Sequence, residues 1–252
     1  QRSMDINSIL GKGKNKRSMS ELSKEKQLLF CSELTDIQLQ LYSVFTAELK
    51  KLKLFDLFQS IEMPLLKVLS DMELEGISLD TEMLSDFSGE LSEEIVNLGG
   101  KIYEISGEEF NLSSPKQMGE ILFEKMKITD KVKKTKTGQY STSEETLSKL
   151  KGEHPIIDQI LEYRGLQKLL STYVKSLPLL LDKNTGKIHT TFNQSVAATG
   201  RLSSVTPNLQ NIPIRTEKGR KMRKAFIPRN EEFEILAADY SQIELRIIAS
   251  LS

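Results

Sequence analysis

Apolar residues recur at intervals of three and four along most of the chain, the spacing of helices that bury one face. After the first of these helices, a new helix is predicted to start at Met63 and Pro64, because proline is tolerated in a first helical turn but not in a helix interior. Gly76 is expected to end that helix in a left-handed conformation. The stripe of the first helix consists of Leu28, Leu34, Ile37, Leu41, Phe45 and Leu49.

The longest stripe follows Asp80, a candidate N-cap, and predicts a helix of at least about 30 Å. Ser114 and Pro115 then begin a capping box and a short helix that runs to about Met126. A further helix is predicted from Pro155 to about Leu177. The buried side of the long helix is expected to consist of Leu84, Phe87, Leu91, Ile95, Leu98, Ile102 and Ile105. That of the further helix is expected to consist of Ile156, Ile160, Tyr163, Leu166, Leu170, Tyr173 and Leu177.

The periodicity changes after residues 182–186, whose residue types predict a turn. Residues 187–192 alternate between apolar and polar and predict a strand. Residues 193–213 have little apolar periodicity, and a strand at 233–238 and a helix at 242–251 follow. His154 and His189 have no partners at metal-ligand spacing, so both are expected to be structural.

Basic and acidic side chains are equal in number, 35 of each in 252 residues, but they are unevenly distributed. Residues 71–110 contain twelve acidic and one basic side chain, a net charge of −11. Residues 201–229 contain eight basic and one acidic side chain, a net charge of +7, which suits a polyanionic partner. No apolar run approaches the roughly 20 residues of a membrane span. The single cysteine, Cys31, indicates an intracellular protein without an internal disulfide.

A lysine-rich segment at residues 131–136 precedes the hydroxyl-rich Ser141, Thr142 and Ser143. These residues fit a solvated loop in which Ser143 caps the next helix. They also fit a set of phosphate contacts at a helix N-terminus, where free N–H groups and the helix dipole favour anions. The residue types alone leave both interpretations open.

Asp239 lies between the strand predicted at residues 233–238 and the helix that follows it. A carboxylate at the end of a buried strand is a candidate ligand of Mg²⁺. Asp239 or Ser241 could instead cap the helix, since Ser241 and Glu244 have capping-box spacing. Spacing alone does not decide between a metal ligand and a cap.

Several motifs resemble those of the family A DNA polymerases, the bacterial DNA polymerase I type, in order along essentially the whole chain. DYSQIELR at residues 239–246 is similar to the first palm motif of that family. TGRLSS at 199–204 and PNLQNIP at 207–213 resemble the template-primer contact region that precedes this motif. Three further motifs resemble thumb segments of the family: EFNLSS at 109–114, EYRGL at 162–166 and STY at 171–173.

The resemblance implies an in-line nucleotidyl transfer assisted by two Mg²⁺ ions. It makes Asp239 the catalytic carboxylate and a metal ligand, with the backbone carbonyl of Tyr240 as another ligand. Glu244 is implied to exclude a ribose 2′-hydroxyl, so that dNTP is the substrate. Arg246 suits a structural ion pair or a substrate contact. The implied nucleotide pocket consists of Tyr240, Ser241, Gln242, Ile243 and Glu244.

The resemblance also implies contacts with primer-template DNA. Arg201 would donate to the minor-groove acceptors that every correct base pair presents at the primer terminus. Asn208, Gln210 and Asn211 are amide donors for the same groove or for the template backbone, and they equally suit turns between Pro207 and Pro213. The implied DNA contacts are Asn111, Ser113, Ser114, Thr142, Ser143, Arg164, Lys168, Thr199, Arg201, Asn208, Gln210, Asn211 and Arg215.

The N-terminal part resembles the end of the 3′-5′ exonuclease domain of such polymerases, notably GKGKN at residues 11–15 and LFCSELTDIQLQ at 29–40. Proofreading members have a tyrosine followed four residues later by a metal-binding aspartate, where this chain has Phe30 and Leu34. Phenylalanine lacks the hydroxyl and leucine cannot bind a metal, so exonuclease activity is expected to be absent. An alternative alignment makes Asp36 the metal ligand and puts Ser32 at the tyrosine position.

We therefore expect an α+β, mostly helical chain in three parts. These are the end of an RNase H-like exonuclease domain (residues 1–60), a helical thumb with connecting helices (61–186), and the first part of an antiparallel-sheet palm (187–252). Both ends are expected to be cuts that leave out the fingers and a second catalytic aspartate, so these residues alone are expected not to polymerise. The expected partners are primer-template DNA and dNTP, in a cytoplasmic, nucleoid-associated monomer without membrane contact. The alternative is a non-catalytic module, derived from a polymerase, that binds primer-template DNA.

Overall fold

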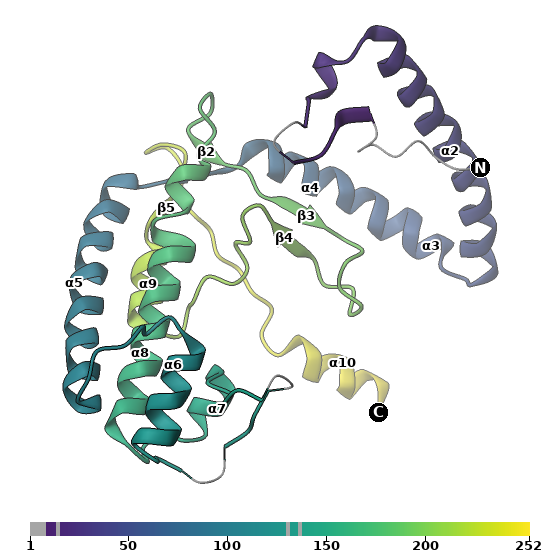
Figure 1. Ribbon diagram of the computed structural model, residues 1–252. Coiled ribbons are helices and arrows are strands. Elements are labelled where there is room, and N and C mark those ends of the chain that lie inside the picture. The colour runs from purple at the N-terminus through teal and green to yellow at the C-terminus, as the bar shows by residue number, and fades with distance from the viewer. Residues whose placement is uncertain (1–8, 14–15, 130–131, 136–137) are drawn as a thin grey trace. The chain divides into compact units, whose positions relative to one another are not determined.

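The computed structural model describes residues 9–13, 16–129, 132–135 and 138–252, which form two compact units, residues 1–71 and 72–252. Helices dominate both units (Figure 1). Lys14 and Asn15 of the GKGKN motif, and Lys131 and Lys136 of the lysine-rich segment, lie outside the described residues. None of the described helices combines the length and the apolar character needed to cross a membrane.

The first unit contains the long helix α2 (Lys24–Lys51), preceded by a 3₁₀ turn (Met19–Glu21). Ser23 caps α2 by accepting a hydrogen bond from the backbone N–H of Lys26 at 3.5 Å. None of its residues is buried, and Leu28 and Phe45 are 69% and 56% exposed. The predicted helix is therefore confirmed, but its predicted buried side is wrong, because no described segment of the unit covers the stripe.

A continuous helical run follows, from α3 (Phe55–Leu57) through a π turn (Phe58–Glu62) into α4 (Met63–Glu75). The helix thus continues through Met63 instead of restarting there. Pro64 is the second residue after the π turn, where the regular hydrogen-bond ladder of the helix is already interrupted. Gly76 ends α4 with φ of +65°, as predicted, and donates its N–H to the carbonyl of Met72 at 3.0 Å.

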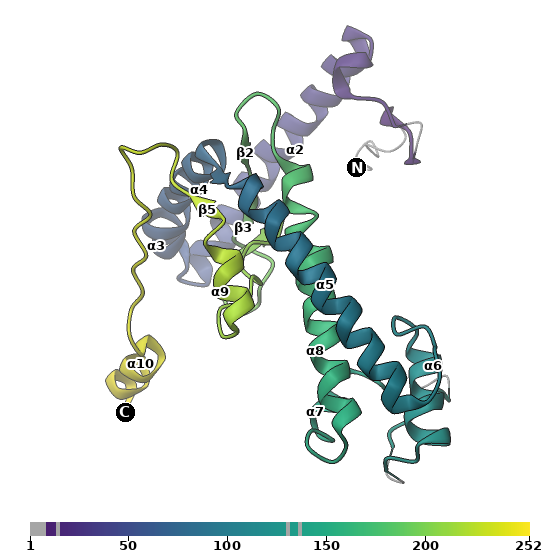
Figure 2. The same ribbon diagram turned by 90° about the vertical axis from the view of Figure 1, so that its left-hand side faces the viewer.

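The core of the second unit lies between two long helices, α5 (Thr81–Ser106) and α8 (Pro155–Leu169), which run side by side (Figure 2). Asp80 caps α5 as predicted, accepting from the N–H of Met83 at 2.8 Å. A π turn (Leu170–Val174) and a 3₁₀ turn (Leu177–Leu180) extend α8. All of the predicted stripe residues of these helices are buried except Ile105, which is 37% exposed at the end of α5.

Three short helical segments cover one end of this helix pair. They are α6 (Pro115–Gly119), the π turn that continues it (Glu120–Lys125), and α7 (Glu144–Ser148). Ser114 caps α6, accepting from the N–H of Gln117 at 3.4 Å. The side chain of Gln117 does not return this bond, as a full capping box would require, and accepts from the N–H of Asn111 at 2.7 Å instead.

Two small antiparallel sheets complete the second unit. β1 (Ile77–Leu79) pairs with β2 (Lys187–Ile188) and with β5 (Phe226–Ile227), so the strand order is β2-β1-β5. β3 (Thr191–Asn193) pairs with β4 (Ser203–Val205), with Phe192 opposite Ser204. The strand predicted across residues 187–192 is therefore split between two sheets. Helix α9 (Glu217–Arg223) precedes β5.

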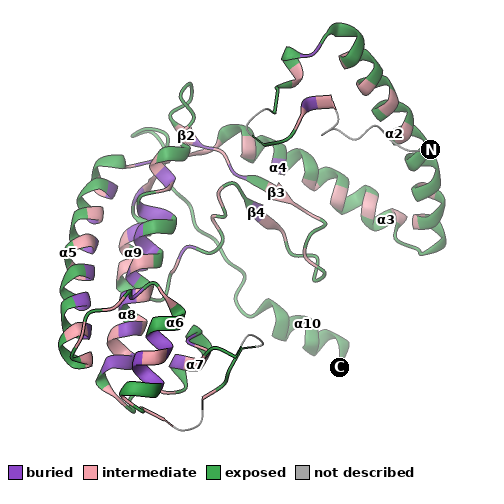
Figure 3. Cartoon of the chain, viewed as in Figure 1, coloured by how far each residue is buried: buried purple, intermediate pink, exposed green. Residues whose placement is uncertain are grey.

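The last part of the second unit differs from the prediction. Helix α10 (Ile243–Leu251) is present, but residues 233–238 form no strand and all residues from 231 to 252 are exposed (Figure 3). A strand needs a neighbour for its backbone hydrogen bonds, and no described segment pairs with these residues. The predicted α+β, mostly helical class with small antiparallel sheets is confirmed.

Candidate nucleic-acid interface

The segment at residues 199–213 is organised by its own side chains. Gln210 binds two backbone groups, accepting from the N–H of Ser204 at 3.2 Å and donating to the carbonyl of Leu202 at 3.1 Å. Asn208 accepts from the N–H of Gln210 at 3.0 Å, an arrangement that closes a turn. The turn-forming interpretation of Asn208 is thus confirmed, and the amide of Gln210 is engaged within the loop. Contact of these exposed side chains with DNA stays a prediction.

The other end of this segment is anchored to two helical elements. Tyr173 donates from its hydroxyl to the carbonyl of Asn211 at 2.7 Å, and burial raises the pKa of Tyr173. Arg223 of α9 donates to the carbonyls of Ile212 at 2.9 Å and Pro213 at 3.2 Å. The anchoring role of Arg223 was not predictable, because a basic residue in a basic segment gives no signal of which backbone carbonyl it will bind.

Much of the basic segment is paired with the acidic segment. Lys218 is bonded to Glu94, and Lys221 lies 2.5 Å from a carboxylate oxygen of Glu90. The ammonium of Lys221 also lies 5.0 Å from the centre of the Phe87 ring. The separate charge blocks of the sequence therefore meet where α9 packs on α5. The described basic residues of this segment that are exposed and form no ion pair are Arg215, Arg220, Arg223 and Lys224.

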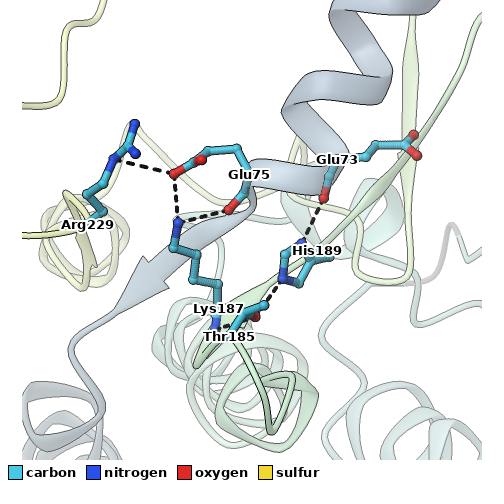
Figure 4. Close-up of polar contacts among 6 residues, drawn as sticks. All are labelled: Glu73, Glu75, Thr185, Lys187, His189 and Arg229. Atoms are coloured by element: carbon cyan, nitrogen blue, oxygen red, sulfur yellow. Dashed lines mark hydrogen bonds and ion pairs between the residues drawn. The ribbon is translucent and has the colours of Figure 1, made fainter.

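A second polar cluster joins the end of α4 to the strand region (Figure 4). Lys187 lies 2.7 Å and Arg229 lies 3.5 Å from a carboxylate oxygen of Glu75, and the hydrogen bond from Lys187 is the main cause of the lowered pKa of Glu75. His189 uses both ring nitrogens, at 2.7 Å from the Glu73 carbonyl and 2.8 Å from the Thr185 hydroxyl.

The structural role predicted for both histidines is confirmed. His189 is held by the two hydrogen bonds of that cluster, and its ring lies against Gly76. A Cβ at position 76 would lie 2.7 Å from that ring, so the position requires glycine for space as well as for its left-handed conformation. His154 precedes α8, and its Nδ1 accepts from the N–H of Ile156 at 3.2 Å.

The predicted catalytic segment is exposed. Asp239 is accessible, and Tyr240 is 84% exposed. Gln242, with φ of +54°, precedes the first residue of α10, and no side chain caps that helix. The interpretation of Asp239 or Ser241 as a helix cap is therefore wrong. Arg246 donates to the carbonyl of Ser241 at 3.2 Å and forms no ion pair among the described residues, so the predicted structural ion pair is also wrong.

Two predicted site residues from distant positions meet. Arg201 Nη2 lies 3.3 Å from Glu244 Oε1, and both side chains are mostly exposed. Exposed pairs of this kind contribute about 0–1 kcal/mol, so the contact leaves both side chains available to a ligand. The bond brings the arginine expected at the primer terminus next to the carboxylate expected at the nucleotide sugar. Thr199 and Arg215, also predicted contacts, are exposed.

Four of the predicted thumb contacts, Ser113, Thr142, Ser143 and Arg164, line one groove of about 510 Å³. Arg164 donates to the carbonyl of Thr142, and its second terminal nitrogen lies 3.2 Å from the Thr142 hydroxyl and 2.8 Å from the Met118 sulfur. Burial lowers the pKa of Arg164. Thr142 is itself buried. Arg164 and Thr142 therefore satisfy each other's hydrogen-bonding groups in the wall of the groove.

The other predicted thumb contacts, Asn111, Ser114 and Lys168, do not line this groove. Ser143 caps α7, accepting from the N–H of Thr146 at 3.3 Å, as the loop interpretation predicted. Asn111 accepts from the N–H of Ser113 at 2.9 Å, and Ser114 caps α6. Lys168 is exposed on α8. Each of these hydroxyl and amide groups thus has a local structural partner, and their contact with DNA phosphates stays a prediction.

Metal ligands are sparse in the described part of the chain, which contains no group of three or more His, Cys, Asp or Glu side chains placed to hold an ion. Mg²⁺ is commonly held by one or two carboxylates and completes its shell with water and substrate phosphates. The exposed carboxylate of Asp239 and the adjacent carbonyl of Tyr240 are oxygen ligands that fit one part of such a shell.

Comparison with known proteins gives one consistent family. The family model of DNA polymerase family A matches residues 81–252. DNA polymerase I of Geobacillus stearothermophilus is 49% identical over 205 residues, which are 81% of this chain and 23% of that protein. DNA polymerase I of Pseudomonas aeruginosa is 43% identical over 246 residues, which are 97% of this chain and 27% of that protein. The chain therefore spans about a quarter of the length of these curated relatives.

A solved structure gives the same answer. The POL domain of Pol1 from M. smegmatis, in complex with DNA primer-template and dNTP, matches the chain with a TM-score of 0.74 and 41% sequence identity. The match covers 84% of this chain and 37% of that chain. An agreement of this size in both sequence and structure shows a shared fold.

Proposed function

Because the chain belongs to DNA polymerase family A, we propose that it forms part of a longer enzyme that copies a DNA template by adding dNTP to a primer 3′-hydroxyl. The observation that carries this proposal is the family match, which runs through both predicted motif regions, residues 199–213 and 239–246. The similar structure from M. smegmatis, solved with primer-template and dNTP, agrees with it. We assign the first part of the palm to residues 187–252 and the thumb to 61–186.

Asp239 is the residue on which the proposed chemistry depends. Nucleotidyl transfer needs charge stabilisation on the attacking and leaving oxygens, and two Mg²⁺ ions supply it in such enzymes. Asp239 and the Tyr240 carbonyl fit as oxygen ligands of one ion. Exposure of both residues is compatible with a role in which substrate phosphates complete the shell.

The neighbouring Arg201 and Glu244 suit the selection of the correct nucleotide. A guanidinium that reaches the minor groove can bind purine N3 and pyrimidine O2, which every correct base pair presents in similar positions. The side chain of Glu244 would occupy the space that a ribose 2′-hydroxyl needs. Their separation of 3.3 Å supports a shared location at the primer terminus, because the terminal base pair and the incoming sugar are neighbours in the product duplex.

The groove beside Arg164 supports binding of the duplex through its backbone. Hydroxyl, amide and basic side chains line it, among them Gln139, Ser141 and Ser143, and such groups bind phosphates without reading sequence. A copying enzyme must bind every sequence, which is the behaviour that this kind of surface provides.

The N-terminal residues 1–60 are proposed to be a scaffold without exonuclease activity. Phe30 and Leu34 lie on α2 and offer no metal ligand. Asp36, the candidate of the alternative alignment, accepts a hydrogen bond from the side chain of Gln40 at 2.8 Å and belongs to no group of metal-binding side chains among the described residues.

The test is Asp239→Asn in the longer polymerase, with Asp182→Asn as the matched control. Asp182 is exposed, and the oxygen that accepts from Asn184 and Thr185 is retained in asparagine. We expect Asp239→Asn to reduce templated dNTP incorporation on the order of 10³-fold and to leave the Kd for primer-template almost unchanged. If Asp239→Asn incorporates dNTP at the wild-type rate, the catalytic role of Asp239 is refuted. Tight primer-template binding without incorporation by any variant would favour the non-catalytic module.

A further inference from the structure

Two buried hydroxyl groups lie beneath the loop that carries Asn208. Thr190, just before β3, and Ser204, in β4, place their hydroxyl oxygens 2.7 Å apart. Ser204 is 0% exposed and Thr190 is 8% exposed. Buried hydroxyl groups need hydrogen-bond partners. Here the partners are the other hydroxyl of the pair and backbone groups of the adjacent loop.

The two hydroxyls bind the backbone of residues 205–209. Thr190 Oγ1 lies 2.8 Å from the Pro207 carbonyl and 3.1 Å from the Val205 carbonyl, and Ser204 Oγ lies 3.1 Å from the Pro207 carbonyl. Ser204 Oγ also accepts from the N–H of Leu209 at 3.1 Å. Each hydroxyl has one proton to donate. A chain from the Leu209 N–H through Ser204 and Thr190 to the Pro207 carbonyl uses every proton once.

The backbone of this loop needs such support. Thr206 has φ of +51°, a left-handed conformation that β-branched residues rarely adopt. Strained backbone of this kind persists where surrounding contacts determine it. The hydroxyl pair supplies those contacts on both sides of Asn208, at Pro207 and at Leu209, while Asn208 itself is exposed.

We propose that Thr190 and Ser204 are positioning residues, whose paired hydroxyls hold residues 205–209 in the shape in which Asn208 contacts the primer-template duplex. The inference rests on the proposed function, because it assigns a task to a loop expected to bind DNA. Thr190 and Ser204 are both buried, so they act through Asn208 and do not touch DNA themselves.

The first measurement is amide hydrogen exchange of the 252-residue chain, which needs no DNA. Thr190→Val keeps the shape of the side chain and removes the hydroxyl, whereas Thr190→Ser keeps the hydroxyl. Thr191→Val is the matched control, since Thr191 is the next residue and is exposed on β3. We expect the Leu209 amide to exchange at least about tenfold faster in Thr190→Val and Ser204→Ala, and within about twofold of wild type in Thr190→Ser and Thr191→Val.

The second measurement is the Kd of the longer polymerase for a fluorescently labelled primer-template duplex, by anisotropy at low salt. We expect Thr190→Val and Ser204→Ala each to weaken binding about tenfold, a loss typical of one good polar contact to a base edge. Asn208→Ala should weaken binding by a similar factor. The double variant Asn208→Ala/Thr190→Val should raise the Kd by about tenfold and not by about a hundredfold, because both changes remove the same contact.

The outcomes separate this inference from the proposed function. If the longer polymerase that contains the wild-type chain does not bind primer-template, both are overturned. If wild type binds and Thr190→Val binds equally well despite fast exchange at Leu209, the proposed function stands and the positioning role is overturned. The positioning role is also overturned if the losses in binding free energy from Thr190→Val and Asn208→Ala add up in the double variant. If Thr190→Val does not fold, as seen by loss of its thermal transition, the cycle of Ser204→Ala with Asn208→Ala decides by the same criterion.

Discussion

The segment at residues 199–213 packs closely against helix α9 at Gly219. A Cβ at this position would lie 2.6 Å from the carbonyl oxygen of Pro213 and 2.7 Å from the Pro213 Cβ. Gly219→Ala must therefore push Pro213 away from α9. The two hydrogen bonds from Arg223 to this part of the loop would be stretched by the same movement.

The size of the effect follows from opposing contributions. Overpacking costs about 1–3 kcal/mol, and weakening neutral backbone hydrogen bonds adds about 0.5–1.5 kcal/mol. Replacing a helical glycine by alanine returns about 0.5–1 kcal/mol. These contributions sum to a loss of about 0.5–4 kcal/mol. We expect Gly219→Ala to reduce the free energy of unfolding by about 2 kcal/mol, near the middle of that range, and to lower Tm by about 4–8 °C, at the 2–4 °C per kcal/mol usual for this chain length.

The assay is urea denaturation followed by circular dichroism, with Gly89→Ala as the matched control. Gly89 is also helical, in α5, and a Cβ there would meet no atom within 4 Å. This control should raise the free energy of unfolding by about 0.5–1 kcal/mol. If Gly219→Ala is as stable as wild type while Gly89→Ala shows its gain, the close packing of the loop on α9 is refuted.

Three other predictions concern single groups. Gly76→Ala should cost about 2–3 kcal/mol of stability, from the left-handed φ and the histidine ring beside it; a thermal-denaturation loss below about 0.5 kcal/mol would contradict it. Since Lys187 lowers the pKa of Glu75, the contribution of Glu75 to stability is present above its unfolded-state pKa and is lost as pH falls through the lower folded-state value. Glu75→Gln should therefore flatten the stability profile measured between about pH 3 and 6, and an unchanged profile would argue against the pair. Gln210→Ala should cost about 1–2 kcal/mol of stability without any DNA present; weaker DNA binding at unchanged stability would instead make Gln210 a direct DNA contact.

Local signals gave the reliable part of the sequence analysis. Asp80 and Gly76 are residue types with strong positional preferences, and both have the predicted roles. The stripes of α5 and α8 were also identified correctly, because helical periodicity repeated over many residues is a strong signal of a buried face.

Features that depend on distant partners were not predictable in this way. The charge blocks at residues 71–110 and 201–229 read as separate surfaces, yet Lys218 and Lys221 bind Glu94 and Glu90 on α5. Residues 233–238 are mostly apolar and have strand character, but a strand forms only where a neighbouring strand pairs with its backbone hydrogen-bonding groups. The hydroxyl pair of Thr190 and Ser204 gave no signal either, since serine and threonine are ordinary residues in a loop.

The central claim is that residues 199–213 lie at the primer terminus, and photo-crosslinking tests it most directly. A primer-template with a photoreactive base at the primer 3′ end would be bound to the 252-residue chain, irradiated and digested with trypsin. We expect the label mainly in the adjoining tryptic peptides of residues 188–201 and 202–215, which contain Arg201 and Asn208. Recovery mainly in peptides of α2, or a label spread evenly over the chain, would contradict it.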